Sequence, residues 1–541
     1  RSVVDLVHGT LSNKQQRFLG SHPVKLVKVG LLRGPALLAL SSRPWICFAE
    51  QPQMHVQMLP LSYDVLEYAA GFHTELCPRG IVAISGKTLR IVGIDAGGHQ
   101  PQMFNQISHP LRYTPRKFVV HPPSRKLIVL ESDQQVASEI LLPTEGDDME
   151  LDGPTPQGQV GDLALPADQA YGPKRAGRGI WSSCIRVLDP RNGRTSYTVR
   201  LEGNQAAFSI CFCRLPNSPW GDHTYLIVGT AKDLTFVPRS CTAGYIYVYQ
   251  VTEDGNQLKQ VHCTEVDNVP YAMCSFQGYL LVGVGKSLRL YDAGRSKLLK
   301  KCELNTFPSF ICSLQTQGDR VVVGDIQESF HMVSYKRSDN LFSIFADDTM
   351  PRYLTASVLL DYDTVAGADK FGNFFVLRLP SDISEDVDDD LSGSAMGGRV
   401  RWDRALLSSA PHKLDALCKF HVGDIISCLD RVVMVPGGKE SIFYTTIMGS
   451  IGAFSPFASK EDVDFFIHLE MHMRVERPSL CGRDHLSFRS VYYPVKDVVD
   501  GDLCEQFLLL DSQQQANIAG ELNVTVPEVI KKLETMRNVI L

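Results

Sequence analysis

The sequence lacks the features that mark membrane insertion, secretion or a basic clamp for nucleic acid. It has no apolar run near 18 residues and no signal-peptide pattern, so we expect neither a membrane-spanning helix nor a membrane partner. Its formal net charge is −6, which argues against generic nucleic-acid binding. The composition is otherwise that of a globular protein, and 541 residues are enough for two or three domains.

A paired cysteine framework is also missing. The 14 cysteines are scattered, and only Cys211 and Cys213 lie close together, where a strand would place both on one face. A metal site would need a second close pair, and none occurs, so buried reduced thiols in a reducing compartment are the favoured interpretation. The first residue is Arg1 rather than methionine, and we expect the sequence to be a piece of a longer protein.

Two stretches come close to a phosphate-binding loop but do not match its pattern. In "GIVAISGKT" (80–88) five residues instead of four separate the two glycines, and before "VGVGKS" (282–287) Leu280 stands where a glycine is required. Strand-like sequence follows the first stretch, where the pattern needs a helix. Hairpin turns therefore explain both stretches better.

Other patterns of catalytic or metal sites are incomplete as well. His468 and His472 have a zinc-compatible spacing, but Leu469 stands where zincins carry glutamate, so a surface or interface helix is favoured. The acidic run 384–390 lacks the alternating ligands and the closing glutamate of an EF-hand loop, and no G-x-S-x-G elbow occurs. We therefore predict no catalytic, cofactor-binding or metal residues and no cofactor.

A repeated strand–turn–strand pattern is the strongest positive signal. The stretch "DTVAGADKFGNFFVLRLP" (363–380) has two strand-like halves around the turn residues of "DKFGN". Similar hairpins each carry two apolar residues followed by a glycine, at Gly229, Gly283, Gly324 and Gly367. The second and third of these glycines are 41 residues apart, and the third and fourth 43, which is the length of a four-stranded propeller blade. No predicted strand ends in the Trp-Asp dipeptide of WD40 repeats.

Two loop-like segments interrupt the repeat, and helices follow it. Residues 140–178 and 381–399 are acidic and rich in glycine, proline or serine, so we predict mobile excursions there. Helical spacing begins near residue 461 and is strongest over 525–540. There Thr525 and Glu528 have the spacing of a capping box.

Several longer stretches resemble one large triple-propeller family. The stretch "DGDLCEQF" (500–507) is similar to the terminal signature of the family that includes the damaged-DNA-binding ubiquitin-ligase adaptor and the large cleavage and polyadenylation specificity subunit. Three further stretches resemble its splicing branch: "IFADDTMPRYLTASVLLDYDTVAGADKFGN" (344–373), "VPGGKESIFYTT" (435–446) and "CGRDHLSFRS" (481–490). The resemblance covers nearly the whole chain.

The resemblance implies a mainly β fold in three parts. We expect the end of a preceding β-propeller at 1–109, a seven-bladed non-WD40 β-propeller at 110–460 and a small C-terminal helical domain at 461–541. The chain would match the C-terminal half of its relatives, without the first propeller that forms part of the family's partner cleft. The N-terminal half would be either a separate polypeptide or missing. Residues 133–178 depart from the long charged helical insertion of the family, which puts contacts made there in doubt.

The resemblance also implies a non-enzymatic scaffold in the nucleus. The family branch belongs to the splicing factor 3B complex of the U2 small nuclear ribonucleoprotein, which supports branch-site recognition in pre-mRNA splicing. Its implied partners are the HEAT-repeat subunit, a small ten-kilodalton-class subunit and a PHD-finger-like zinc protein, with RNA contacted only indirectly. The alternatives are an adaptor of a cullin ubiquitin ligase, a polyadenylation subunit or, from another class, a propeller enzyme with acids converging at its mouth.

Six residues are candidates for partner binding under this resemblance. Those in the segment 349–370 and the stretch 425–448 fall in the family's contact region, and the sixth lies near the helical tail. They are Arg352, Tyr353, Asp363, Lys370, Arg431 and Lys496. We expect Arg352 and Tyr353 to be interface anchors whose replacement leaves the propeller folded. The alternative is that these polar residues only solvate a loop.

Overall fold

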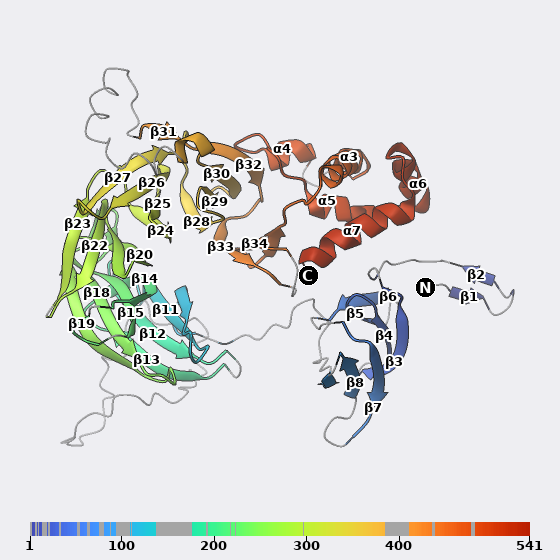
Figure 1. The fold of residues 1–541 in the computed structure, drawn as a ribbon, viewed down its shortest axis with the longest axis horizontal. Helices are drawn as coiled ribbons and strands as arrows, with labels where there is room; N and C mark the ends of the chain where they lie inside the picture. Colours follow the sequence, from blue (N-terminus) through green and yellow to red (C-terminus); the bar gives the residue numbers. More distant parts are fainter. Residues whose placement is uncertain are drawn as a thin grey trace.

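A computed structural model describes the chain over residues 22–93, 111–136, 176–384 and 410–540, with short gaps inside these ranges and a few isolated positions elsewhere. Most of these residues form strands, which confirms the prediction of a mainly β protein (Figure 1). The excursions predicted at 140–178 and 381–399 lie outside the described residues, except at 176–178 and 381–384.

Two sheets and a short hairpin are described before residue 94. Their strands are β1 (Val3–Asp5) with β2 (Thr10–Ser12); β3 (Lys25–Leu31), β4 (Gly34–Leu40), β5 (Pro44–Glu50) and β6 (His55–Pro60); and β7 (Tyr68–Phe72), β8 (Gly80–Ser85) and β9 (Thr88–Gly93). The two larger sheets pack against each other through Val29, Leu38 and Ile81. Such packing is expected of neighbouring blades in one propeller. Two sheets are only part of a propeller, so the end of a preceding propeller at 1–109 stays a prediction.

Six further sheets follow between residues 115 and 454. In chain order they are β10 (Pro115–Val120), β11 (Leu127–Gln134), β12 (Trp181–Leu188), β13 (Thr195–Leu201); β14 (Gln205–Arg214), β15 (Thr224–Lys232), β18 (Ala243–Val251), β19 (Leu258–Val266); β20 (Pro270–Phe276), β21 (Tyr279–Val284), β22 (Ser287–Ala293), β23 (Leu298–Leu304); β24 (Ile311–Gln317), β25 (Arg320–Asp325), β26 (Ser329–Lys336), β27 (Leu341–Asp347); β28 (Leu354–Leu359), β29 (Thr364–Asp369), β30 (Asn373–Arg378), β32 (Asp415–His421); and β33 (Ile426–Val432), β34 (Ser441–Thr446), β35 (Ile451–Phe454).

Two additions decorate these sheets. The small hairpin β16 (Thr235–Phe236) and β17 (Arg239–Ser240) stands between β15 and β18, and β31 (His412–Lys413) pairs in parallel with β27 as a fifth strand. All other pairings within the six sheets are antiparallel, each strand lying beside its neighbour in sequence as in a propeller blade.

The six sheets are arranged radially, with the first strand of each on the inside (Figure 1). Successive innermost strands contact one another in the order β10, β14, β20, β24, β28 and β33. Each of them carries a β-bulge near its start, at Arg116, Phe208, Tyr271, Cys312, Thr355 and Ser427. A bulge increases local twist and bends a strand, which suits a strand that lines an axis. This recurrence of a bulge on each innermost strand was not predicted from the sequence.

The repeated glycines allow neighbouring sheets to approach closely. All four lie on the second strand of their sheets, as the repeat requires. A Cβ on Gly229, Gly283 or Gly324 would meet the first residue of the next innermost strand at 2.5 to 2.9 Å, which is Pro270, Ile311 or Leu354 respectively. Gly367 is offset by one residue and would instead meet Phe330 of the preceding sheet at 2.7 Å. The predicted equivalence therefore holds for three glycines and is wrong by one position for the fourth.

Six of the seven predicted blades are described as sheets, and the seventh stays a prediction. Six sheets are described where seven blades were expected, and the last of them, β33–β35, has three strands. Figure 1 shows these sheets as an arc running from β10–β13 to β33–β35. The seventh blade and the closure of the ring are therefore predictions that the described residues leave open.

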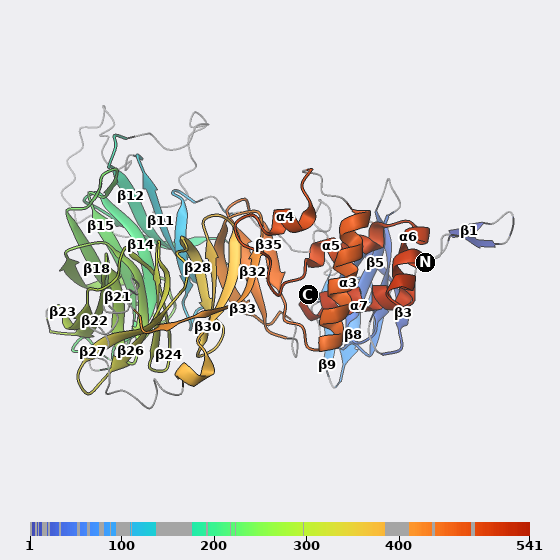
Figure 2. The same ribbon diagram turned by 90° about the horizontal axis from the view of Figure 1, so that it is seen from above.

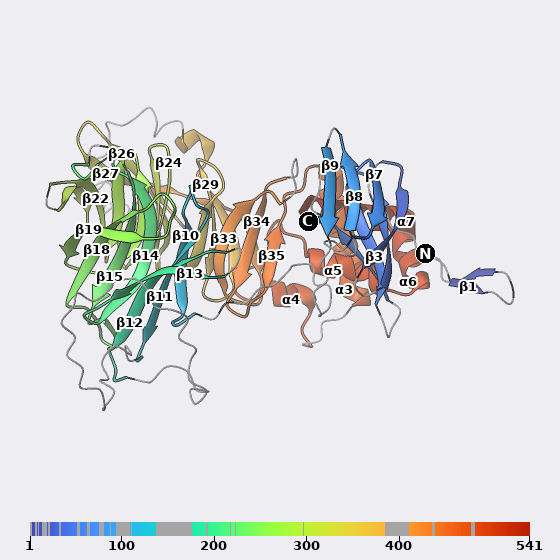
Figure 3. The ribbon, with the colours of Figure 1, turned by 90° about the horizontal axis from the view of Figure 1, so that it is seen from below.

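The chain ends in a helical module beside the last two sheets. Its helices are α3 (Lys460–Glu476), α4 (His485–Arg489), α5 (Gly501–Glu505), η2 (Gln506–Leu509), α6 (Ser512–Glu521) and α7 (Val526–Ile540). The predicted helices at 461–476 and 525–540 are confirmed as α3 and α7. Glu528 accepts hydrogen bonds from the backbone N–H and the hydroxyl of Thr525, at 2.7 and 2.9 Å. Val529 and Leu533 are buried in the module's core, and Figures 2 and 3 show α4 next to the sheets rather than over a propeller face.

Candidate functional site

Arg352 is a structural residue of the fold. It lies between β27 and β28, only 2% of it is exposed, and its Nε donates a 2.8 Å hydrogen bond to Oδ2 of the equally buried Asp348. Its guanidinium carbon lies 4.0 Å from the ring centre of Phe375 and 5.2 Å from that of Tyr493. Arg352 is therefore enclosed by its own chain, and its role as an interface anchor stays a prediction.

Asp363 and Arg431 lie at the opposite end of β28 and β29 from Tyr353 and Lys370. The half-buried Asp363 pairs with Nη1 of Arg320 at 3.0 Å and accepts a hydrogen bond from the Ser384 hydroxyl. Arg431 is exposed on β33, donates to the carbonyl of Leu360 and pairs with Glu440 at 3.5 Å. The six candidates therefore do not form one site.

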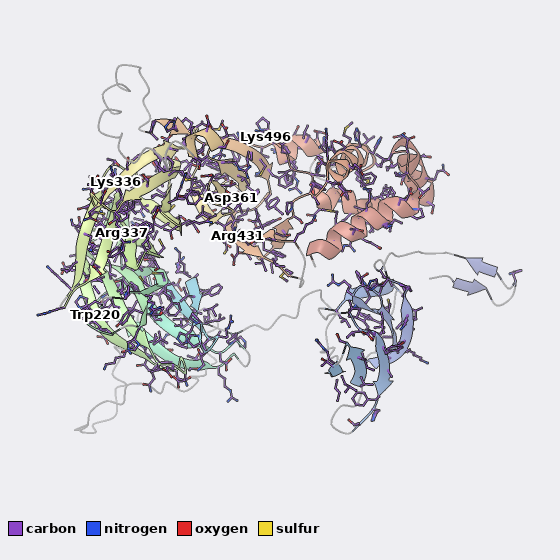
Figure 4. The ribbon with its side chains drawn as sticks, in the orientation of Figure 1. Trp220, Lys336, Arg337, Asp361, Arg431 and Lys496 are labelled. Carbon is purple, nitrogen blue, oxygen red and sulfur yellow. The ribbon has the colours of Figure 1, made fainter. Side chains whose placement is uncertain are left out.

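Lys496 holds the helical tail to the outer strand of a sheet. It forms an isolated antiparallel bridge with Lys419 of β32, and its Nζ donates to the carbonyl of Ala416 at 2.6 Å. Figure 4 labels Lys496 near α4 and Arg431 near β33, well apart in that view. Lys496 has an intramolecular role, although it is exposed.

The remaining two candidates meet in an exposed aromatic patch. We define this patch as Tyr353, Lys370, Phe371 and Tyr492. The Lys370 ammonium lies 3.6 Å from the Tyr353 ring centre, and the Phe371 ring lies 5.8 Å from Tyr353 and 4.9 Å from Tyr492. Phe371 is 41% exposed and Tyr492 is 55% exposed. The patch joins the β29–β30 turn to the helical tail, two segments more than 100 residues apart in sequence.

The turn that carries Lys370 and Phe371 is rigidly built. Asp369 is buried and accepts hydrogen bonds from the backbone N–H of Phe371 at 2.8 Å and from both the N–H and the Nδ2 of Asn373 at 3.1 and 2.8 Å. Gly372 has φ +84°, a conformation that glycine adopts without strain. The acidic residue of "DKFGN" therefore shapes the turn.

Arg489 is the main link between the tail and the sheet beneath the patch. Its guanidinium pairs with Asp500 at 2.7 Å and donates to the carbonyls of His421 and Val422 at 3.1 and 2.9 Å. The buried His421 has its Nδ1 3.1 Å from the Asn373 amide oxygen. Burial, together with the nearby Arg489 charge, lowers the pKa of His421. At neutral pH it is therefore uncharged in this junction.

The incomplete sequence motifs have structural roles. Gly285 and Lys286 form the β21–β22 turn, and on α3 His472 pairs with Glu521 at 2.9 Å. Within the described residues no group of three or more His, Cys, Asp or Glu is placed to hold a metal ion. No described helix is long and apolar enough to cross a membrane.

The described innermost strands of the arc carry one lysine, Lys117 of β10, whose pKa is lowered by desolvation, and few acidic side chains. Among the described residues the six innermost strands contain no histidine or glutamate and a single aspartate, Asp430. Several thiols lie on them, and burial raises the pKa of Cys213 to about 11 and that of Cys274 and Cys312 to about 12. These thiols are therefore protonated at neutral pH and weakly nucleophilic.

Phe371, Tyr492 and Lys419 were not predicted from the sequence. Phe371 lies within a stretch that carried the family resemblance, Tyr492 lies close to one, and Lys419 lies outside them. None has a local pattern that distinguishes it from a core or loop residue. The signal that could have identified Phe371 and Tyr492 is that two of the stretches contact each other in the fold. Residues 344–373 and 481–496 pack against each other in the structure, through Phe371 with Tyr492 and Arg352 with Tyr493.

Comparison with known proteins gives matches along the whole chain. The family model for the CPSF A subunit region matches residues 182–509, and one described as the RSE1/DDB1/CPSF1 second beta-propeller matches residues 1–94. The chain is 47% identical to spliceosome-associated protein 130 A of Arabidopsis thaliana over 100% of its length and 45% of that protein.

Two further relatives give the same result. The chain is 48% identical to splicing factor 3B subunit 3 of Danio rerio and 43% identical to pre-mRNA-splicing factor RSE1 of Mycosarcoma maydis. Each match covers 99% of this chain and 44% or 43% of the relative. The chain therefore spans less than half the length of the curated relatives it matches.

Proposed function

Since this chain belongs to the CPSF A subunit family and is similar over its whole length to splicing factor 3B subunit 3, we propose that it is a non-enzymatic scaffold in pre-mRNA splicing. The single observation that carries the proposal is the 43–48% identity to splicing factors from plant, animal and fungus over at least 99% of the chain. It would act in the nucleus, in the splicing factor 3B complex, through protein–protein contacts.

The proposed partners are the HEAT-repeat subunit, the small ten-kilodalton-class subunit and the PHD-finger-like zinc protein of that complex. RNA would be contacted only indirectly and no cofactor would be needed. The three-part organisation at 1–109, 110–460 and 461–541 belongs to the same proposal.

The aromatic patch is the proposed contact surface. Tyr353 and Lys370 remain from the original candidates, and Phe371 and Tyr492 join them. Exposed aromatic rings are enriched at the centres of interfaces, because they bring large contact areas with few side-chain torsions to order. The rings are held in place by their mutual packing and by the rigid turn, which lowers the entropy cost of binding.

Affinity purification from nuclear extract tests this proposal. The tagged wild-type chain should recover splicing factor 3B subunits. The double substitution Phe371→Ala and Tyr492→Ala should reduce recovery about tenfold or more, since hot-spot residues cost roughly 2 kcal/mol or more. Leu341→Ala is the matched control, because Leu341 is 59% exposed on β27 and lies outside the patch.

Three outcomes would change the proposal. Recovery of a cullin or of polyadenylation factors in place of splicing factors would favour the alternatives within the family. Equal recovery of splicing factors by the wild-type chain and the double variant would keep the scaffold and remove the patch from it. Conversion of a small-molecule substrate by the purified chain would exclude a non-enzymatic role.

A further inference from the structure

Beneath the aromatic patch, the hydrogen-bonding capacity of Arg352 is only partly used. Its Nε is bound by Asp348, but Nη1 and Nη2 are buried and have no hydrogen-bond partner among the described residues. The two aromatic rings of Phe375 and Tyr493 lie close to the guanidinium, yet rings do not satisfy N–H donors. Leaving such donors unpaired costs free energy, and more so in a charged group.

A second cation lies in the same place. The half-buried Lys419 of β32 has its Nζ 5.4 Å from the ring centre of Tyr493, the ring that also neighbours Arg352. The polar contact recorded for this ammonium is the thioether sulfur of Met350 at 4.0 Å, which is a weak acceptor. Burial and the Arg352 charge both lower the pKa of Lys419.

The negative charge next to these two cations is the carboxylate of Asp348, which already accepts several hydrogen bonds. Its donors are Nε of Arg352, the Ser329 hydroxyl at 2.6 Å and the Met350 N–H at 3.3 Å. Lys496, which is bridged to Lys419, is a further cation close to that lysine, so positive charge is in excess here. Two guanidinium donors and an ammonium are left for an acceptor.

We propose that Arg352 and Lys419 form a binding site for one carboxylate, supplied by an aspartate or glutamate side chain of a partner protein. An anion offsets the excess positive charge, and the paired Nη1 and Nη2 donors match the two oxygens of a carboxylate. The donors are covered in the free chain, so entry requires the half-buried side chains of Lys419 and Tyr493 to rotate outward. The site rests on the proposed scaffold function and names the chemistry of the partner.

The position of the site also favours a protein partner. Tyr353 follows Arg352 and Tyr492 precedes Tyr493, so the carboxylate site directly adjoins the exposed aromatic patch. A partner segment with an acidic residue next to an apolar one would occupy the carboxylate site and contact the aromatic patch at the same time. This arrangement combines a charged anchor with a ring-lined contact area.

Anion-dependent stability is the first test, because it needs no partner. Sodium acetate should raise the melting temperature of the wild-type chain in a dose-dependent manner relative to sodium chloride at equal ionic strength. Lys419→Met should abolish the rise and Lys419→Arg should keep it. Lys336→Met is the matched control, since Lys336 is a partly buried lysine paired with Asp339 on another sheet.

The result that would overturn the site is equal stabilisation of wild type and Lys419→Met, or none in either. A larger effect of sodium phosphate than of acetate in the wild type would overturn the carboxylate assignment in favour of a phosphate group. Melting in chloride alone verifies that the Lys419 variants fold. Arg352 itself is not replaced in this test, because its burial makes it part of the fold.

Complex formation is the second test. Binding of purified splicing factor 3B partners should weaken about tenfold or more with Lys419→Met and stay unchanged with Lys336→Met. Unchanged binding with Lys419→Met would overturn the proposed role of the site while the scaffold function stands. If the wild-type chain binds no splicing partner, the scaffold function fails and the partner assignment of this site fails with it, whereas the acetate experiment still decides whether the site exists.

Discussion

The sheets that begin at β14, β20 and β24 and the sheet that begins at β28 share one strand order but are held to their neighbours by different means. The first three present a glycine to the next innermost strand, so packing there is close and apolar, with Ile311 and Leu354 among the neighbours. The sheet of β28 has buried polar side chains such as Asp369 and Asn373, as the sheet of β24 has Asp325. In addition, Arg489 and Lys496 of the helical tail donate hydrogen bonds to it.

The difference follows from what each sheet has to contact. A sheet between two similar sheets packs mainly through apolar side chains, where shape complementarity matters most. The sheet of β28 also carries the helical tail, whose backbone and side chains bring polar groups that need partners. Two of the stretches that carried the family resemblance, 344–373 and 481–490, lie on the two sides of this junction. The repeat therefore builds the propeller, and the polar junction specifies how the tail joins it.

The largest expected effect breaks the polar junction at Arg352. Arg352→Met should lower the free energy of unfolding by about 3–5 kcal/mol, because it leaves the buried Asp348 without its ionic partner. The control is Arg378→Met in the same sheet, where the pair with Asp361 is about half exposed and is worth at most about 1 kcal/mol. Chemical denaturation measures both, and equal small losses would contradict the structural role of Arg352.

Arg489 tests whether the tail is held by the polar junction alone. Arg489→Met removes the ion pair with Asp500 and the hydrogen bonds to the carbonyls of His421, at the end of β32, and of Val422, which follows it. The substitution should cost about 2–3 kcal/mol. Hydrogen exchange should rise in α4 and at the end of β32 but not in β20–β25. Arg537→Met, which breaks an ion pair within the helical module, is the control. A uniform rise over all sheets would mean that the junction and the repeat unfold as one unit.

Gly283 tests the apolar side of the comparison. Gly283→Ala would bring a Cβ to about 2.5 Å from Ile311 Cγ2, so the next sheet has to shift, at an expected cost of about 1–3 kcal/mol. Gly520→Ala on α6 is the control, because nothing lies within 4 Å of the added carbon and alanine favours a helix. Thermal unfolding compares the two, and a neutral Gly283→Ala would show that close approach is not the reason for the glycine.

The smallest expected effect is a pH dependence of the junction. His421 has a lowered pKa in the folded chain, so between the folded and the ordinary pKa the unfolded chain binds more protons. Stability should therefore fall as pH drops below about 6.5, by less than about 1.4 kcal/mol per pH unit for this group. His421→Gln should reduce the slope between pH 7 and pH 5. An unchanged slope would assign the acid sensitivity to other groups.

The sequence by itself determined the repeat and the ends of the chain's elements. Glycine recurrence, turn residues and alternating apolar positions identified the hairpins, because these signals are local and periodic. The capping pair of Thr525 and Glu528 likewise predicted where α7 begins. The bulges of the innermost strands were not found, since a bulge is a property of strand pairing and leaves no fixed residue type.

Only the tertiary structure decided which of the candidate side chains are exposed. Arg352 and Tyr353 are neighbours in sequence, yet Arg352 is enclosed by Phe375 and Tyr493 while Tyr353 joins an exposed patch. That outcome depends on the tail, which folds back over more than 100 residues to place Tyr492 and Tyr493 on the β28 sheet. Local sequence encodes strand and turn, but burial depends on what the rest of the chain brings to the same place.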